Sequence, residues 1–197
     1  MDQQDMTADA LVFIDFDGVI CNSLAECYAS SWLAYYTYVK GEENISVQLR
    51  QKHLFDQYRP FIRNGEDYVL LQDCIEKGIE LPNQKAFDAV LKKQGRMRMA
   101  EFSGFFYKAR KTLLENYRGY WLSLNRLYPD VAGIIKKAAE CDAIHILSTK
   151  RPEFIIEILN ANAIYWKRGR IHYPVKIGKI AYIEKILDEK PAMKAVF

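Results

Sequence analysis

Residues 11–20 read LVFIDFDGVI, and this stretch decides how the rest of the chain is interpreted. An apolar run, typical of a buried strand, ends in two carboxylates one residue apart, followed by a glycine. Because successive side chains of a strand point to opposite faces, we expect Asp15 and Asp17 to share a side. Two neighbouring like charges are costly to bury without a cation or strong hydrogen bonds.

Such a pair of acids suits metal-assisted group transfer, in which one carboxylate attacks or binds the metal and the other moves a proton. Gly18 allows the backbone to turn sharply and to approach a ligand closely. The alternative interpretation is that Asp15 caps a turn and Asp17 is simply solvated.

The composition is that of a folded globular chain. Its 197 residues, 50% of them hydrophobic, suffice for one sizeable core or a core with a modest insertion. The formal net charge of +3 is too small to indicate a nucleic-acid partner, although it suits an anionic substrate. The four cysteines form no Cys-x-x-Cys pair and no zinc spacing, so we expect reduced thiols. The polar amino terminus is unlike a signal peptide and no apolar run could span a bilayer, so we expect a cytoplasmic protein without a membrane partner.

The spacing of apolar residues divides the chain into a helical segment and an α/β remainder. Between about 23 and 120, apolar residues recur three and four apart, which predicts helices over 45–58, 66–77, 84–93 and 100–117, with breaks such as the one at Gly95. Beyond 127, helices and strands alternate: a helix capped by Asp130, a strand over 143–147, a helix over 152–161, a short strand within 170–175, a helix over 180–188 and a strand at 193–197.

This alternation predicts an α/β fold with a Rossmann-like parallel sheet and helices on both of its faces. We expect residues 1–22 and 126–197 to form that core, and residues 23–125 to be an inserted all-helical domain. Ligands in such sheets bind beyond the carboxyl ends of the strands. Asp15 and Ser148 both lie at such ends.

The DFDG sequence of residues 15–18, placed after an apolar strand, resembles the first signature of the haloacid dehalogenase (HAD) superfamily. Ser148 matches the second signature, and residues 149–152, TKRP, resemble its phosphatase-type continuation. Lys179 is similar to the third signature, a lysine just before the last core helix, with Lys176 as the alternative. The helical segment lies where the family carries a C1-type cap.

The resemblance implies a Mg²⁺-dependent phosphatase of the phosphoglycolate-phosphatase-like branch, acting on a small phosphorylated metabolite. Asp15 would attack phosphorus and Asp17 would serve as general acid and then base. The Asp15 carboxylate and the Asp17 main chain would bind Mg²⁺. Ser148 and Lys179 would hold and neutralise the phosphoryl oxygens. Because the true dehalogenases lack the second aspartate, Asp17 favours phosphate chemistry.

The remaining candidate substrate-binding residues are Gly18, Thr149 and Lys150 beside the signatures, and Arg59 and Arg63 in the cap. The two arginines flank a helix break, from which they could reach a substrate carboxylate or a second phosphate. The alternative is that this segment is a solvated turn between helices.

One departure from the family pattern concerns its fourth signature, an acidic pair that supplies metal ligands. No such acids stand at or after the strand expected at 193–197. We expect either that the sequence stops short of them or that the protein lacks this ligand set, with impaired metal affinity and turnover. The alternatives to a phosphatase are therefore a non-catalytic binding or regulatory protein with the same fold, or a sugar-phosphate mutase.

Overall fold

The structure is a computed structural model that describes residues 10–43, 46–174, 177–189 and 193–197. Its contacts divide the chain into two compact units. One combines Met1–Asn22 with Arg126–Phe197, and the other is Ser23–Asn125. Lys176, the alternative motif lysine, lies outside the described residues.

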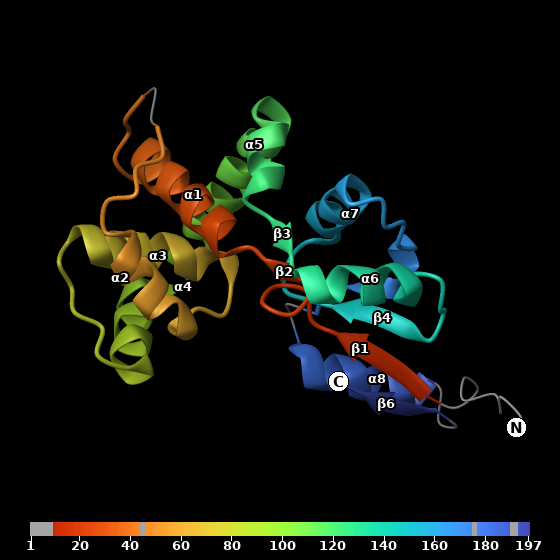
Figure 1. Ribbon diagram of the computed structural model, residues 1–197. Helices are drawn as coiled ribbons and strands as arrows, with labels where there is room; N and C mark the ends of the chain where they lie inside the picture. Colours follow the sequence, from red (N-terminus) through yellow and green to blue (C-terminus); the bar gives the residue numbers. More distant parts are fainter. Residues whose placement is uncertain (1–9, 44–45, 175–176, 190–192) are drawn as a thin grey trace, which may run out of the picture. The chain divides into compact units, whose positions relative to one another are not determined.

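The first unit is built on a four-stranded parallel sheet in the order β5-β4-β1-β6 (Figure 1). Its strands are β1 (Ala10–Ile14), β4 (Ile144–Leu147), β5 (Ile171–His172) and β6 (Lys194–Val196). β1 is central, with Phe13 opposite His145 of β4 and Leu11 opposite Ala195 of β6. The fold class expected from the sequence, an α/β parallel sheet accompanied by a helical region, is confirmed.

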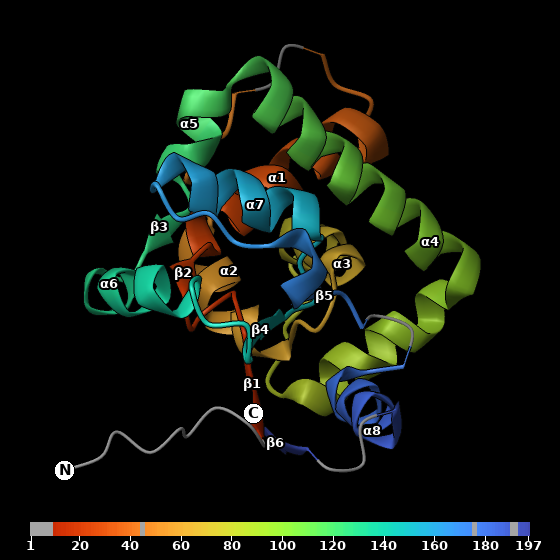
Figure 2. The ribbon, with the colours of Figure 1, turned by 90° about the vertical axis from the view of Figure 1, so that its right-hand side faces the viewer.

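Helices lie on both sides of this sheet. α6 (Pro129–Ala138) and α8 (Lys179–Glu189) flank opposite faces, as Figure 2 shows, and α7 (Pro152–Ala161) follows β4. On the α8 side, Leu11, Phe13 and Leu147 pack against the helix through Tyr182, Ile183 and Ile186. Alternation along β1 therefore directs its odd-numbered side chains toward α8.

A small antiparallel ladder joins the two points at which the chain leaves and re-enters this unit. β2 (Cys21–Asn22) pairs with β3 (Arg126–Leu127), and the Tyr128 N–H donates to the Ile20 carbonyl at 3.1 Å. These short strands carry no alternating apolar pattern of their own, so the spacing of apolar residues does not predict them.

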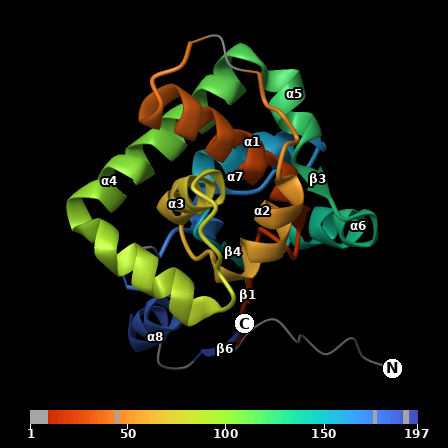
Figure 3. The same cartoon turned by 90° about the vertical axis from the view of Figure 1, so that its left-hand side faces the viewer.

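The second unit is helical and packs around one aromatic-rich core (Figure 3). Its elements are α1 (Leu24–Ala34), a π-helix at Tyr35–Val39, α2 (Lys52–Tyr58), a 3₁₀ turn at Arg59–Phe61, α3 (Gly65–Glu76), α4 (Gln84–Asn116) and α5 (Arg118–Ser123). α4 bends where Gly95 adopts φ +75°, which confirms the break expected there.

Two predicted helix starts are wrong. The helix expected over 45–58 begins only at Lys52, because Gln51 is left-handed and the Tyr28 hydroxyl donates to the carbonyls of Gln48 and Arg50, at 2.6 and 2.9 Å. Asp130 lies in the first turn of α6, and Tyr128 occupies the cap position, because Pro129 starts the helix with its φ already fixed.

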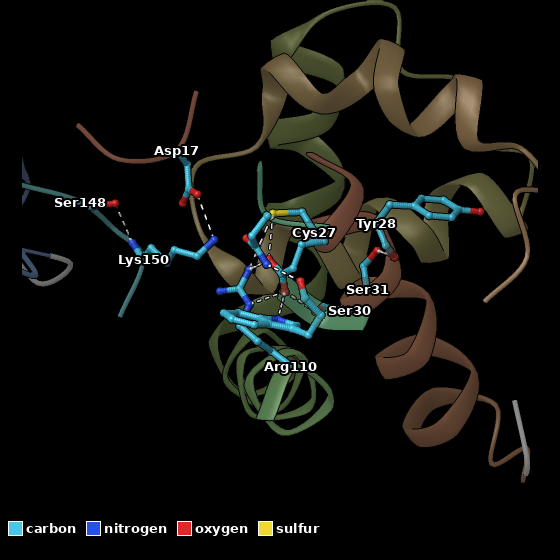
Figure 4. A network of polar contacts seen from close by, with 11 residues as sticks. Asp17, Cys27, Tyr28, Ser30, Ser31, Arg110, Ser148 and Lys150 are labelled. Atoms are coloured by element: carbon cyan, nitrogen blue, oxygen red, sulfur yellow. Dashed lines mark hydrogen bonds and ion pairs between the residues drawn. The ribbon is translucent and has the colours of Figure 1, made fainter. Parts of the chain in front are cut away.

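The helical unit contains a fully buried ion pair. Arg110 donates to both carboxylate oxygens of Glu26, at 2.8 and 2.7 Å, and the two side chains are 4% and 0% exposed. Ser30 and Trp121 donate to the same carboxylate, at 2.6 and 3.2 Å. Arg110 also donates to the Cys27 sulfur of α1 at 3.7 Å (Figure 4). The charge is therefore compensated by hydrogen bonds on several sides, as a buried carboxylate requires.

The core unit contains a half-buried chain of hydrogen bonds. His145 of β4 and His172 of β5 stack at 5.0 Å and share a hydrogen bond of 2.8 Å between Nδ1 and Nε2. Nδ1 of His172 lies 3.0 Å from the Tyr182 hydroxyl of α8. Burial, then His145 and Arg168, lower the pKa of His172 to about 4.

No helix in the described part of the chain combines the length and the apolar character needed to cross a membrane.

We predict that Arg110→Met lowers the free energy of unfolding by about 3–5 kcal/mol, because it leaves the Glu26 carboxylate buried without its partner. Urea denaturation measures the change. The double variant Glu26→Gln with Arg110→Met should recover part of the loss, because no uncompensated charge then remains. A single-variant loss below about 1 kcal/mol would contradict the compensation argument.

Stability should also fall in acid. The unfolded chain binds a proton at His172 near pH 6.5 but the folded chain only near pH 4, so the unfolded state holds more protons between these values. The free energy of unfolding therefore decreases as the pH falls through this window, by about 2 kcal/mol at pH 5. Urea denaturation at pH 7 and pH 5 tests this, and His172→Gln should reduce the difference. If wild type and variant lose the same amount of unfolding free energy between pH 7 and pH 5, the loss comes from groups other than His172.

Candidate active site

The candidate site lies at the carboxyl ends of β1 and β4, which point to the same edge of the sheet (Figure 1). β1 ends at Ile14, so Asp15 is the first residue beyond it, and β4 ends at Leu147, immediately before Ser148. Loops that follow parallel strands at this edge form the usual ligand-binding crevice of α/β folds.

Asp15 is held by the backbone N–H of the next residue, Phe16, and by a lysine from α8. The Phe16 N–H donates to Oδ1 at 2.7 Å, and Nζ of Lys179 lies 2.5 Å from Oδ2. The Asp15 and Lys179 side chains are 32% and 23% exposed, so water and a ligand can reach both. Nζ of Lys179 also lies 5.1 Å from the centroid of the Phe197 ring.

A tight turn carries Asp17. The Phe16 carbonyl accepts hydrogen bonds from the N–H groups of Ile20 and Cys21, both at 2.9 Å, and the Gly18 N–H donates to the Cys21 carbonyl at 2.8 Å. Gly18 adopts φ +84°, which a side chain would strain although there is space for one. The turn begins directly after Ile14, so the two-residue alternation of a strand does not by itself determine where Asp17 points.

Lys150 reaches Asp17 from the loop after β4. Its Nζ lies 3.0 Å from Oδ1, and its side chain is fully buried (Figure 4). A buried ammonium requires a compensating charge, and Asp17 supplies one. From the sequence, Lys150 is expected to contact substrate. The pairing with Asp17 joins residues 133 positions apart, and no sequence spacing indicates it.

Ser148 is fixed in the same loop. Its N–H donates to the His172 carbonyl at 3.1 Å, and its Oγ accepts from the Lys150 N–H at 3.1 Å. An oxygen that accepts in this way still has its own proton to donate. Thr149 is half-buried between the two, and the loop leads into α7 at Pro152.

Arg59 and Arg63 belong to the helical unit, where each has partners of its own. The Arg59 guanidinium lies 5.3 Å from the centroid of the Tyr68 ring. Arg63 donates to both carboxylate oxygens of Asp88, at 2.8 and 3.0 Å, and this hydrogen bond lowers the pKa of Asp88. Their contact with a substrate stays a prediction.

The core residues offer few carboxylates to a metal. Within the described ranges, no three His, Cys, Asp or Glu side chains lie close enough together to hold an ion. Mg²⁺ is often held by one or two carboxylates together with waters and substrate phosphate. Asp15 and Asp17 fit that minimal set, although each carboxylate also has a lysine beside it.

Comparison with known proteins supports the fold. No protein-family model and no curated protein matches this sequence. A solved structure does: the crystal structure of a predicted phosphoglycolate phosphatase from Haemophilus somnus 129PT, with a TM-score of 0.52 and 17% sequence identity, over 95% of this chain and 74% of that one. At this identity the likeness shows that the two chains share a fold and no more.

We predict that Gly18→Ala lowers the free energy of unfolding by about 1–2 kcal/mol, because a side chain disfavours the left-handed conformation of this turn. Gly169→Ala is the matched control in the same unit. A Cβ there also meets nothing within 4 Å, but its φ is not left-handed. The free energies of unfolding of the two variants, measured by urea denaturation, should differ by at least about 1 kcal/mol. Equal values would show that the turn around Gly18 accommodates a side chain without strain.

Proposed function

We propose that this protein is a Mg²⁺-dependent phosphatase that hydrolyses a small phosphomonoester through an aspartyl-phosphate. One observation carries the proposal: Asp15, at the carboxyl end of the central strand, lies 2.5 Å from Lys179, with a second carboxylate, Asp17, two residues along the chain. A carboxylate nucleophile and a phosphate repel each other, and the Lys179 cation beside Asp15 reduces that repulsion. Because Asp15 is partly exposed, a phosphate can reach it.

In the proposed reaction, Asp15 attacks phosphorus and the bond to the ester oxygen breaks. Asp17, which must carry a proton at this step, gives it to the departing oxygen and becomes the carboxylate that compensates Lys150. Asp17 then takes a proton from water, which attacks phosphorus and breaks the bond to Asp15, so that the carboxylate is restored. The contact with Lys150 and the turn around Gly18 hold Asp17 in place for both transfers.

Two groups would stabilise the charge on the transferred phosphoryl group. Lys179 offsets the charge of Asp15 before attack and that of the phosphoryl oxygens afterwards. The Ser148 hydroxyl would donate its proton to one of those oxygens. Gly18 and Thr149 border these groups in the sequence and are proposed to line the substrate. Lys150, expected from the sequence to do the same, is fully buried and is proposed to act through Asp17.

The metal would be held by the Asp15 carboxylate and the main chain of Asp17, and it would supply Lewis-acid stabilisation of the phosphate. Because a lysine stands beside each carboxylate, we expect weak Mg²⁺ binding unless phosphate completes the coordination.

We further propose that residues 23–125 act as a cap that sets substrate choice. The structural neighbour is a predicted phosphoglycolate phosphatase, which supports a small phosphorylated substrate. Arg59 and Arg63 are the candidates for a second anionic group of that substrate. Arg63 would have to leave Asp88 to serve in this way.

A second candidate function is a binding or regulatory protein that keeps the fold without turnover. It is favoured by the lysine pairing of both acids and by the lack of a third metal-ligating side chain within the described ranges. Such a protein would bind phosphate or vanadate and release no product.

Purified protein with Mg²⁺ should release p-nitrophenol from p-nitrophenyl phosphate, and EDTA should abolish this activity until Mg²⁺ is restored. Asp15→Asn should lower kcat by about 10³-fold or more, since it removes the nucleophile. Asp142→Asn is the matched control, because Asp142 is an exposed acid of the same unit that pairs with Lys167. It should leave the rate unchanged.

Activity that survives Asp15→Asn would show that Asp15 is not the nucleophile. Vanadate binding without any hydrolysis in the wild type would favour the non-catalytic candidate instead.

A further inference from the structure

We propose that His172 and Tyr182 are positioning residues that hold the first turn of α8, and with it Lys179, against Asp15. The inference concerns the same site as the proposed function and rests on it for its catalytic consequence. The geometry it predicts for Lys179 can be measured without any assay of activity.

The position of Lys179 depends on how α8 is fixed on the sheet. Lys179 is the first residue of the helix, and Tyr182 follows it by three residues, about one turn. No residue of α8 is fully buried. Its apolar contact with Leu11, Phe13 and Leu147 is non-directional, so packing alone allows the helix to shift along the sheet.

The Tyr182 hydroxyl adds a directional contact to this interface. It lies 3.0 Å from Nδ1 of His172, within hydrogen-bond reach. A hydrogen bond has a narrow range of distance and angle, so it fixes the helix where apolar contacts leave freedom. The sheet end of the bond is itself rigid, since the His172 ring stacks on His145 and packs against Phe13, at centroid distances of 5.0 and 5.9 Å.

His172 also holds the other side of the site. Its carbonyl accepts the N–H of Ser148 at 3.1 Å, while its ring contacts Tyr182. One residue of β5 therefore fixes both the loop that carries the Ser148 hydroxyl and the helix that carries the Lys179 ammonium. The spacing between these two groups, which are proposed to share one phosphoryl group, is set through His172.

Tyr182→Phe isolates the contribution of the hydroxyl, because the ring and its packing remain. Ile186→Val is the matched control: it weakens the same apolar face of α8 without touching the hydrogen bond. Urea denaturation establishes that both variants are folded and places their stabilities on one scale.

The first measurement is competitive acetylation with N-hydroxysuccinimidyl acetate, read by mass spectrometry. Lys179, in contact with Asp15, should react more slowly than exposed Lys185 of the same helix. Tyr182→Phe should raise the labelling of Lys179 relative to Lys185 about fivefold, the factor that loss of one hydrogen bond of ordinary net strength gives in a local opening equilibrium. Ile186→Val should leave the ratio unchanged. Equal ratios in the two variants would overturn the proposal.

The second measurement is kinetic. Tyr182→Phe should lower kcat for p-nitrophenyl phosphate by about tenfold with little change in KM. The reason is that a misplaced Lys179 ammonium weakens stabilisation of the transition state more than it weakens substrate binding. His172→Gln, which keeps a hydrogen-bonding group, should lose less than His172→Phe. A kcat in Tyr182→Phe equal to that of Ile186→Val would overturn the catalytic consequence.

The two proposals fail in different ways. If the wild type shows no hydrolysis but the labelling ratio responds to Tyr182→Phe, the proposed function is wrong and the positioning of Lys179 stands. If the wild type hydrolyses phosphate and neither measurement separates the variants, the proposed function stands and the positioning role is wrong.

Discussion

The ion pair between Asp15 and Lys179 is the constraint on which the candidate site depends. It joins the end of the central strand to the start of the last core helix, 2.5 Å apart. Two acids at one strand end would repel each other, and a low-dielectric crevice would increase the cost. Lysines at both positions reduce that repulsion, with Lys150 beside Asp17 and Lys179 beside Asp15. The site can therefore hold two carboxylates in the folded protein.

The two lysines differ in what a ligand can reach. Lys150 is fully buried, so its charge serves Asp17 and fixes the turn around Gly18. Lys179 is 23% exposed and can face an incoming anion while it contacts Asp15. This difference fits the proposed function, in which Lys150 orients Asp17 and Lys179 meets the phosphate. Solvent also weakens the Lys179 contact more, so its position depends on how α8 is held.

The helical unit is stabilised in another way. Its core is aromatic-rich, and a buried carboxylate–guanidinium pair, Glu26 and Arg110, joins α1 to α4 across 84 residues of sequence. Such a pair adds little net stability when intact but is costly to break, so it selects one packing of these helices over others. The proposed role of this unit, a cap that sets substrate choice, requires a defined shape of this kind.

The sequence by itself determined the α/β class, the helical region and the placement of Asp15 and Ser148 at strand ends, because these follow from apolar periodicity and from turn-forming residues, which act locally. It misplaced the start of α2, where a tertiary hydrogen bond from Tyr28 overrides local helix propensity. Only the tertiary structure decided which lysine faces which acid, and that His172 and Tyr182 meet. These contacts join segments that are brought together by the sheet order β5-β4-β1-β6. A contact between residues far apart in the sequence produces no periodic pattern in either segment, so the spacing of apolar residues does not predict it.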